Sequence, residues 1–209
     1  MTQVANDAHA RRSRLMLVVA VIILVLVADL WSKQWAWDAL RDGQRVALIE
    51  QVLYFKFGFN TGSAFSLLQD AAWSRVFFIA VTLLALVYMG WLALHLSAQR
   101  RYGFVAIGLI AGGALGNLHD RFVRRLEVPL DGQVVERYGV VDFIQFYYHW
   151  DSGRYWPIFN IADAALVCGV GLLLVHLWSE EKARQQAERA MAEDTGTDGL
   201  ANSTAPVDP

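Results

Sequence analysis

The stretch 138-YGVVDFIQFYYHWDSGRYWPIFNIADAA-165 is the one around which the rest of the chain is organised. It places two carboxylates, Asp142 and Asp163, in strongly apolar or aromatic surroundings, and Asp163 lies just inside a segment that is otherwise typical of a membrane helix. Ionisable groups at membrane depth are energetically costly, and they are usually kept only where they have a function. The two aspartates are therefore candidate functional residues.

The composition is that of a membrane protein. Of the 209 residues, 56% are hydrophobic and only 18% are charged, which is too apolar for an ordinary soluble domain of this size. The net charge of -2 gives no electrostatic reason to expect nucleic acid as a partner. The single cysteine, Cys168, lies in an apolar run, so it forms no intramolecular disulfide and is most simply a packing residue.

Four apolar segments are predicted to span the membrane, at about 15–31, 71–96, 104–118 and 157–178. A polar cytoplasmic segment, residues 1–14, precedes the first span, which continues as an amphipathic extension to about Arg41 without an obvious signal-peptide cleavage site. The third span carries Gly108, Gly112 and Gly116, a spacing typical of close helix packing. We expect residues 15–178 to form one membrane domain and residues 179–209 a cytoplasmic tail that is disordered from about 195.

Two segments between the spans favour β-structure. Residues 44–62 are rich in β-branched and aromatic residues and predict a small sheet on the membrane surface that leads into the turn Asn60-Thr61-Gly62. Residues 124–139 predict a hairpin with Asp131-Gly132 as its two-residue turn. The predicted fold is an all-α membrane protein with four transmembrane helices, a small extracytoplasmic β-sheet that acts as a cradle, and a surface helix or loop.

Four spans place both termini on the same side of the membrane. The totals of Lys and Arg on the two sides do not decide which side this is. However, Arg11, Arg12 and Arg14 directly precede the first span, and Arg100 and Arg101 lie in a very short loop. Because such charge close to helix ends is typical of the cytoplasmic side, we expect both termini to be cytoplasmic and the two aspartates to lie near the outer face.

Polar residues gather near that outer boundary. Three pairs have the spacing of neighbours on one helical face: Asp29 with Lys33, Asn117 with Asp120, and Asn160 with Asp163. Such residues can simply contact headgroups or cap helices, although this interpretation is weakest for Asp163, one turn inside an apolar helix. Alternatively, two close carboxylates can share a proton, so that one activates a water as general base while the other polarises a carbonyl. That chemistry suits peptide hydrolysis.

Other catalytic chemistries have little support. The sequence contains no HExxH zinc motif, no GxSxG nucleophile motif and no phosphate-binding glycine loop, and its five histidines show no metal-ligand spacing. We therefore expect neither a metal nor a cofactor. A small transporter or channel is the main alternative, but it predicts polar residues throughout the bilayer depth, whereas the middle of each predicted span is apolar. A presenilin-like protease is disfavoured because a GxGD motif is absent.

Five blocks follow one another along the chain: DLWSK at 29–33, FNTGSAFSLL at 59–68, GGALGNLHDR at 112–121, VVDFIQF at 140–146 and FNIADAAL at 159–166. Together, and in this order, they resemble the lipoprotein signal peptidase (signal peptidase II) family of bacterial inner-membrane aspartyl proteases. The resemblance implies that Asp142 and Asp163 are the catalytic dyad. It also implies a set of residues that shape and support the site: Asp29, Lys33, Asn60, Gly62, Asn117, Asp120, Arg121 and Asn160.

The resemblance further implies the reaction, which is removal of the signal peptide from a prolipoprotein whose lipobox cysteine already carries diacylglycerol, by cleavage on the amino side of that cysteine. The expected partners are such prolipoproteins, membrane lipids and globomycin-type inhibitors, but no nucleic acid. We expect a monomer in the inner membrane with its active site near the periplasmic face. One departure from the family is the 124–139 hairpin, which looks like an insertion; it could alter how the site meets the substrate or be a tolerated surface loop.

Overall fold

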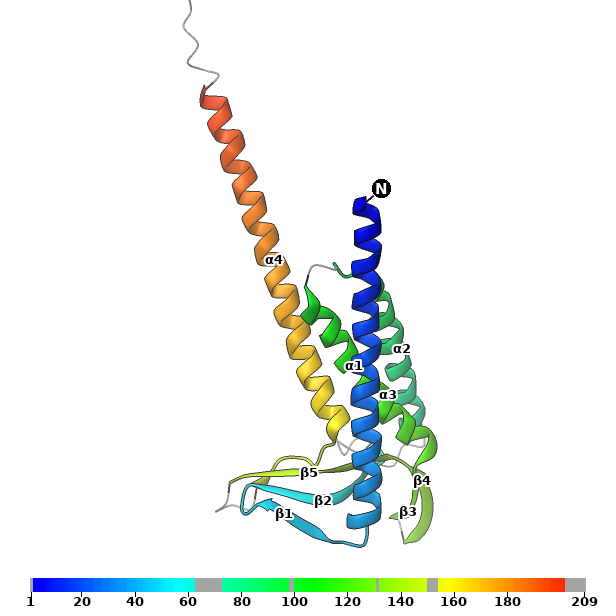
Figure 1. Cartoon of the computed structure of the whole chain (residues 1–209). Helices are drawn as coiled ribbons and strands as arrows, with labels where there is room; N and C mark the ends of the chain where they lie inside the picture. Colours follow the sequence, from blue (N-terminus) through cyan, green and yellow to red (C-terminus); the bar gives the residue numbers. More distant parts are fainter. Residues whose placement is uncertain (1, 63–72, 98–99, 131, 150–153, 202–209) are drawn as a thin grey trace, which may run out of the picture.

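The computed structural model describes residues 2–62, 73–97, 100–130, 132–149 and 154–201. Its helices run side by side, and the strands lie across one end of them, here called the sheet end (Figure 1). The helices are α1 (Thr2–Leu40), α2 (Ser74–His95), α3 (Arg101–Val123) and α4 (Ile161–Ala201). Within the described residues, four helical stretches are long and apolar enough to cross a membrane: Ala8–Leu40, Ser74–His95, Arg101–Val123 and Ile161–Arg189. The predicted fold class is confirmed.

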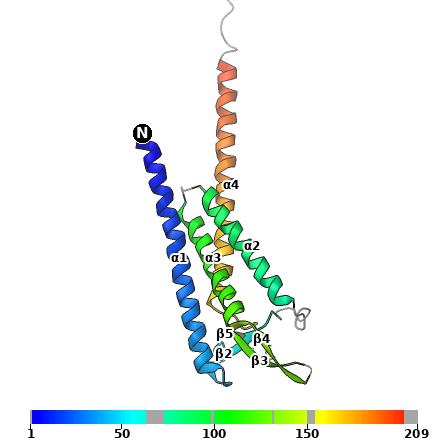
Figure 2. The same ribbon diagram turned by 90° about the vertical axis from the view of Figure 1, so that its right-hand side faces the viewer.

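The strands form a cradle and a separate hairpin. The antiparallel cradle has the order β1-β2-β5-β6, and the hairpin pairs β3 with β4. Their bounds are β1 (Arg45–Ile49), β2 (Leu53–Asn60), β3 (Arg125–Leu130), β4 (Gln133–Tyr138), β5 (Val140–His149) and β6 (Arg154–Tyr155). In the cradle, Asp142 of β5 lies opposite Gly58 of β2. Figure 2 shows the hairpin extending below α2 and α3, and Figure 1 shows the cradle on the side of the sheet end opposite to the hairpin.

The central helix of the bundle is α3. In its most apolar stretch, 72% of the residues are buried inside the protein, compared with 22% in α1, 11% in α2 and 22% in α4. Two glycines show why other helices approach it so closely. A Cβ on Gly112 would lie 2.9 Å from Cβ of Val25 in α1, and one on Gly116 would collide with the Asp29 carboxylate. The predicted glycine face is thus a packing surface for α1.

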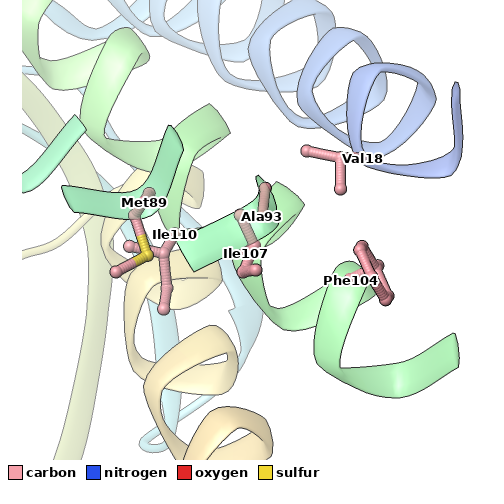
Figure 3. Close-up of a cluster of buried hydrophobic side chains, with 6 residues drawn as sticks. All are labelled: Val18, Met89, Ala93, Phe104, Ile107 and Ile110. Atoms are coloured by element: carbon pink, nitrogen blue, oxygen red, sulfur yellow. The ribbon is translucent and has the colours of Figure 1, made fainter. Parts of the chain in front are cut away.

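The half of the bundle remote from the strands is held together by apolar side chains. Figure 3 shows this cluster, which is contributed by α1, α2 and α3 and consists of Val18, Met89, Ala93, Phe104, Ile107 and Ile110. Outside it, many large apolar side chains of α1, α2 and α4 are exposed, as is typical of helices that face lipid.

Several boundaries differ from those predicted. α1 begins at Thr2 rather than near 15, and α3 extends beyond 104–118 at both ends. α4 begins at Ile161, four residues after Pro157, because Asn160 provides its N-cap. The helix continues to Ala201, beyond the point near 195 where disorder was expected to begin. The solvated part of α4 carries stabilising i,i+4 contacts, such as the one between Arg184 and Glu188.

Strands form in the two segments for which the sequence predicts β-structure, and also in a third segment for which it does not. The segment 44–62 contains β1 and β2, and 124–139 contains the hairpin, whose turn residue Gly132 has φ of +77°; Asp131 lies outside the described residues. The strand that carries Asp142 was not predicted. The expected surface helix or loop is not among the elements that the structure describes, since residues 63–72 lie outside that part of the chain.

Candidate active site

The site is built on the first turn of α4. Asn160 precedes the helix, and its Oδ1 accepts a hydrogen bond of 2.9 Å from the backbone N–H of Asp163. In return, Oδ2 of Asp163 accepts a hydrogen bond of 3.2 Å from the backbone N–H of Asn160. This reciprocal arrangement is a capping box made from Asn and Asp. It holds the Asp163 carboxylate in one position, at a helix N-terminus where negative charge is favoured.

Asp142 reaches the same place from β5. The Nδ2 group of Asn160 donates a 2.6 Å hydrogen bond to its Oδ1, and Nδ2 of Asn60 donates a 3.2 Å hydrogen bond to its Oδ2. Asn160 therefore bonds to both aspartates, one through its side chain and one through its backbone. The Asn60 amide is itself oriented, because its Oδ1 accepts a 3.0 Å hydrogen bond from the N–H of Gly62. Gly62 makes this turn at φ of +108°, which favours glycine.

Burial changes the chemistry of Asp142. Its side chain is almost inaccessible to water, and loss of hydration disfavours the ionised form. Together with the negative charge of Asp163, this burial raises the pKa of Asp142 to about 7. The hydrogen bonds from Asn60 and Asn160 and the charge of Lys33 act in the opposite direction but are weaker. Asp142 is therefore a carboxyl group that can hold a proton near neutral pH.

Asn117 of α3 supports Asp163 from the other side. Its Nδ2 group donates a 2.8 Å hydrogen bond to Oδ1 of Asp163. Its Oδ1 accepts hydrogen bonds of 2.9 Å from Nζ of Lys33 and 3.1 Å from Nδ2 of Asn160. Because both donors lie at the oxygen end, they fix the amide so that its nitrogen faces Asp163.

Beneath these side chains lies a fully buried ion-pair cluster. Nζ of Lys33 is 2.7 Å from Oδ2 of Asp29 and 3.5 Å from Oδ2 of Asp120. Each carboxylate also binds another element: Oδ1 of Asp29 accepts a 2.9 Å hydrogen bond from the N–H of Ala162, and Oδ2 of Asp120 accepts one of 3.1 Å from the N–H of Val141. Buried charges are tolerated only with this degree of pairing. The cluster ties α1 and α3 to α4 and β5.

Arg121 lies at the edge of the site. Its guanidinium donates a 3.1 Å hydrogen bond to the carbonyl of Asn117 and lies 5.0 Å from the centre of the Phe78 ring. It makes no hydrogen bond to Asp142 or Asp163 within the described residues, although the negative charges of both act on it. Thus all ten residues singled out in the sequence are connected by hydrogen bonds and ion pairs in one network: Asp29, Lys33, Asn60, Gly62, Asn117, Asp120, Arg121, Asp142, Asn160 and Asp163.

Two further arginines were missed by the sequence reasoning. Nε of Arg124 lies 3.0 Å from Oδ1 of Asp120, and their i,i+4 spacing was a usable signal. Nε of Arg75 donates a 2.9 Å hydrogen bond to the carbonyl of Arg121, a long-range contact for which the sequence has no signal. In the described part of the chain, no group of three or more His, Cys, Asp and Glu side chains is arranged to hold a metal ion.

The fold and these contacts define a class of protein. It is a multi-pass membrane protein in which two aspartates, each hydrogen-bonded to Asn160, lie at one end of the helical bundle. The model of the family described as signal peptidase (SPase) II matches residues 21–179. This chain belongs to the signal peptidase II family, as its resemblance predicted. It is accordingly a membrane protease of the lipoprotein-processing type.

Individual relatives cover most of the chain. The lipoprotein signal peptidase of Anoxybacillus flavithermus is 34% identical over 170 residues, which is 81% of this chain and 90% of the relative. That of Polynucleobacter necessarius is 38% identical over 167 residues, or 78% of this chain and 87% of the relative. A solved structure described as a bacterial membrane enzyme matches with a TM-score of 0.62 and 27% identity, covering 78% of this chain and 88% of its own. A second solved structure, also described as a bacterial membrane enzyme, matches with a TM-score of 0.58 and 28% identity. The match covers 79% of this chain and 92% of the other.

Proposed function

We propose that this protein is an intramembrane aspartyl endopeptidase that removes the signal peptide from diacylglyceryl-modified prolipoproteins, cleaving on the amino side of the lipidated lipobox cysteine. Family membership supports the reaction. The assignment of Asp142 and Asp163 as its catalytic dyad rests on one observation above all, which is that Asn160 is hydrogen-bonded to both carboxyl groups.

In the proposed mechanism the two aspartates have different roles. Asp163, at the N-terminus of α4, is the general base and takes a proton from water as the water oxygen attacks the scissile carbonyl carbon. Asp142, whose raised pKa of about 7 lets it carry a proton, donates that proton to the carbonyl oxygen. The C–N bond then breaks as Asp163 passes its proton to the cysteine nitrogen and Asp142 takes one from a hydroxyl of the intermediate. The enzyme returns to its starting protonation state.

The remaining polar residues position the dyad. Asn60 and Gly62 hold Asp142 from the cradle, and Asn117 holds Asp163 from α3. Lys33, Asp29 and Asp120 fix the elements that carry these groups, while Arg121 places positive charge beside the developing negative charge. None of these supporting residues needs to exchange a proton with the substrate.

We place the site at the periplasmic face of the bacterial inner membrane, with both termini in the cytoplasm. Two observations support this orientation: Arg11, Arg12 and Arg14 precede the span at the end of α1 remote from the strands, and the exposed Trp31 and Trp73 lie near the sheet end, as in an interfacial aromatic belt. In this position the substrate's acyl chains can stay in the bilayer while the scissile bond meets water.

The test is a gel-shift assay of the purified full-length protein on a diacylglyceryl-modified prolipoprotein, with mass spectrometry of the new N-terminus. We compare the wild type with Asp142→Asn, Asp163→Asn and Asp38→Asn, a control at an exposed aspartate of α1. The wild type and the control should cleave before the modified cysteine and be blocked by globomycin. The two dyad variants should lose at least about 10³-fold in kcat while keeping the wild-type circular dichroism spectrum. Wild-type turnover in either dyad variant would refute the dyad, and failure of the folded wild type to cleave would refute the reaction.

A further inference from the structure

A pocket of about 330 Å³ lies between the β3–β4 hairpin and the first turn of α2. Its walls come from three parts of the chain: the turn after β2, the start of α2 and strand β4. The lining residues used in the argument are Thr61, Ser74, Arg75, Glu136, Arg137 and Tyr138. None of them belongs to the five sequence blocks in which the dyad and its supporting residues lie, except Thr61.

Positive charge dominates this pocket. The Arg75 guanidinium stacks 3.7 Å from the centre of the Tyr138 ring and donates from Nε to the carbonyl of Arg121. These contacts hold it in place, and it has no carboxylate partner among the described residues. Arg137 is half-buried, and its side chain makes no ion pair or hydrogen bond within the described residues. The pocket also contains Glu136, but its Oε2 lies 3.3 Å from the guanidinium of Arg125, which balances its charge.

Two guanidinium groups without a carboxylate partner in one pocket indicate an anion as the ligand. Arginine binds carboxylates with short, charge-assisted hydrogen bonds, often through two nitrogens at once. The hairpin strand that lines the pocket faces solvent, since Val134 and Glu136 are exposed. A ligand could therefore enter while it is still part of a longer chain.

The pocket is connected directly to the proposed active site. Thr61 follows Asn60, whose side chain is hydrogen-bonded to Asp142. On the opposite wall, Arg75 is bonded to the backbone of Arg121, which lies at the edge of the dyad site. One residue on each side, Asn60 or Arg121, separates the pocket wall from the dyad site. Because an extended peptide advances about 3.3 Å per residue, the first few residues beyond the scissile bond are the ones near enough to enter the pocket.

The polarity of the pocket selects the part of the substrate that can enter it. The apolar core of a signal peptide and the acyl chains of the modified cysteine both favour the bilayer, whereas the segment after the cysteine passes into water. We propose that the pocket binds an acidic side chain of this mature segment, about two to five residues after the cleaved bond, and that the hairpin makes cleavage selective for charge. This inference rests on the proposed function.

The test uses the full-length protein in phosphatidylcholine vesicles and a set of diacylglyceryl-modified prolipoprotein peptides. The peptides are identical except at the second to fifth residues after the cysteine, which carry only Gln, one Glu at each position in turn, or one Lys. Wild type is compared with Arg137→Gln and Arg137→Glu. Lys56→Glu is the matched control, since Lys56 is exposed on β2 and does not line the pocket.

For the best-placed Glu, we expect wild-type kcat/KM to exceed that of the Gln peptide by about five- to tenfold, mainly through KM; tenfold corresponds to about 1.4 kcal/mol. Arg137→Gln should abolish this preference and Arg137→Glu should reverse it in favour of Lys, while Lys56→Glu keeps the wild-type ratio. All variants should cleave the Gln peptide equally well.

Two results would overturn the inference while leaving the proposed function intact. One is cleavage of the Gln peptide with no dependence on peptide charge. The other is an acceleration by phosphatidylglycerol that is independent of the peptide and lost in Arg137→Gln, which would assign the pocket to a lipid phosphate. If the wild type cleaves no peptide of the set, the proposed function itself fails, and the inference fails with it.

Discussion

The two ends of the helical bundle are stabilised in different ways, although the same helices build both. At the end remote from the strands, α1, α2 and α3 meet through an apolar cluster that includes Val18, Phe104 and Ile107. At the sheet end, α1 and α3 meet through the buried charges of Lys33 and Asp120. The comparison shows that one bundle can combine packing by shape with packing by paired charge.

The difference matters because lipid supplies little hydrophobic drive for association between helices. Apolar contacts at the remote end are non-directional, so a truncated side chain leaves only a cavity. At the sheet end the buried charged groups have specific partners on other elements, such as the N–H of Ala162 for Asp29 and the amide oxygen of Asn117 for Lys33. Loss of one group there leaves the others buried without a partner.

The largest effect is expected from a substitution in the buried ion-pair cluster at the sheet end. Lys33→Met removes the cation shared by Asp29 and Asp120, so it should lower the free energy of unfolding by about 3–5 kcal/mol. Cleavage should also be lost, because the Asn117 amide loses one of the two donors that orient it toward Asp163 and the elements that carry the dyad lose their shared cation. Thermal unfolding in detergent and the gel-shift assay measure the two effects, with Lys56→Met as an exposed control. A wild-type Tm in Lys33→Met would contradict this account of the sheet end.

An intermediate effect is expected from a substitution in the apolar cluster at the end remote from the strands. Ile107→Ala leaves a cavity in the cluster and should lower the free energy of unfolding by about 2–4 kcal/mol. Because the cluster does not touch the dyad, the folded variant should keep the kcat and the pH profile of the wild type. Cleavage rates measured below the unfolding transition at several pH values test this separation of the two ends. A changed pH profile in Ile107→Ala would show that the ends are coupled.

The smallest change concerns the proton of Asp142. If protonated Asp142 is the acid, kcat/KM should fall as pH rises through about 7, since this is the pKa to which burial and Asp163 raise it. The hydrogen bond from Asn60 favours the ionised form, so Asn60→Ala should raise the pKa further and move the basic limb of the profile to higher pH. The loss of one hydrogen bond should also reduce kcat/KM by about tenfold at pH 6. A basic limb that moves to lower pH would contradict the assignment of Asp142 as the acid.

Much of the fold could be predicted because it depends on local properties of the chain. Apolar runs of sufficient length defined the spans, and turn residues defined the hairpin. The four-residue helical spacing predicted that Asp29 lies beside Lys33, and Oδ2 of Asp29 is 2.7 Å from Nζ of Lys33. The strand that carries Asp142 was missed because it directly follows the hairpin, and pairing with β2 selects the extended structure for its residues.

The sequence by itself determined that this chain would enter a membrane, where its helices would run and which polar residues would share a helical face. These follow from hydropathy and periodicity, which are properties of neighbouring residues. Only the tertiary structure decided that Asn60 meets Asp142, that Lys33 orients Asn117 and that Asp29 binds the first turn of α4. Such contacts join residues far apart in the chain, and they form only when all the helices and the cradle pack at once.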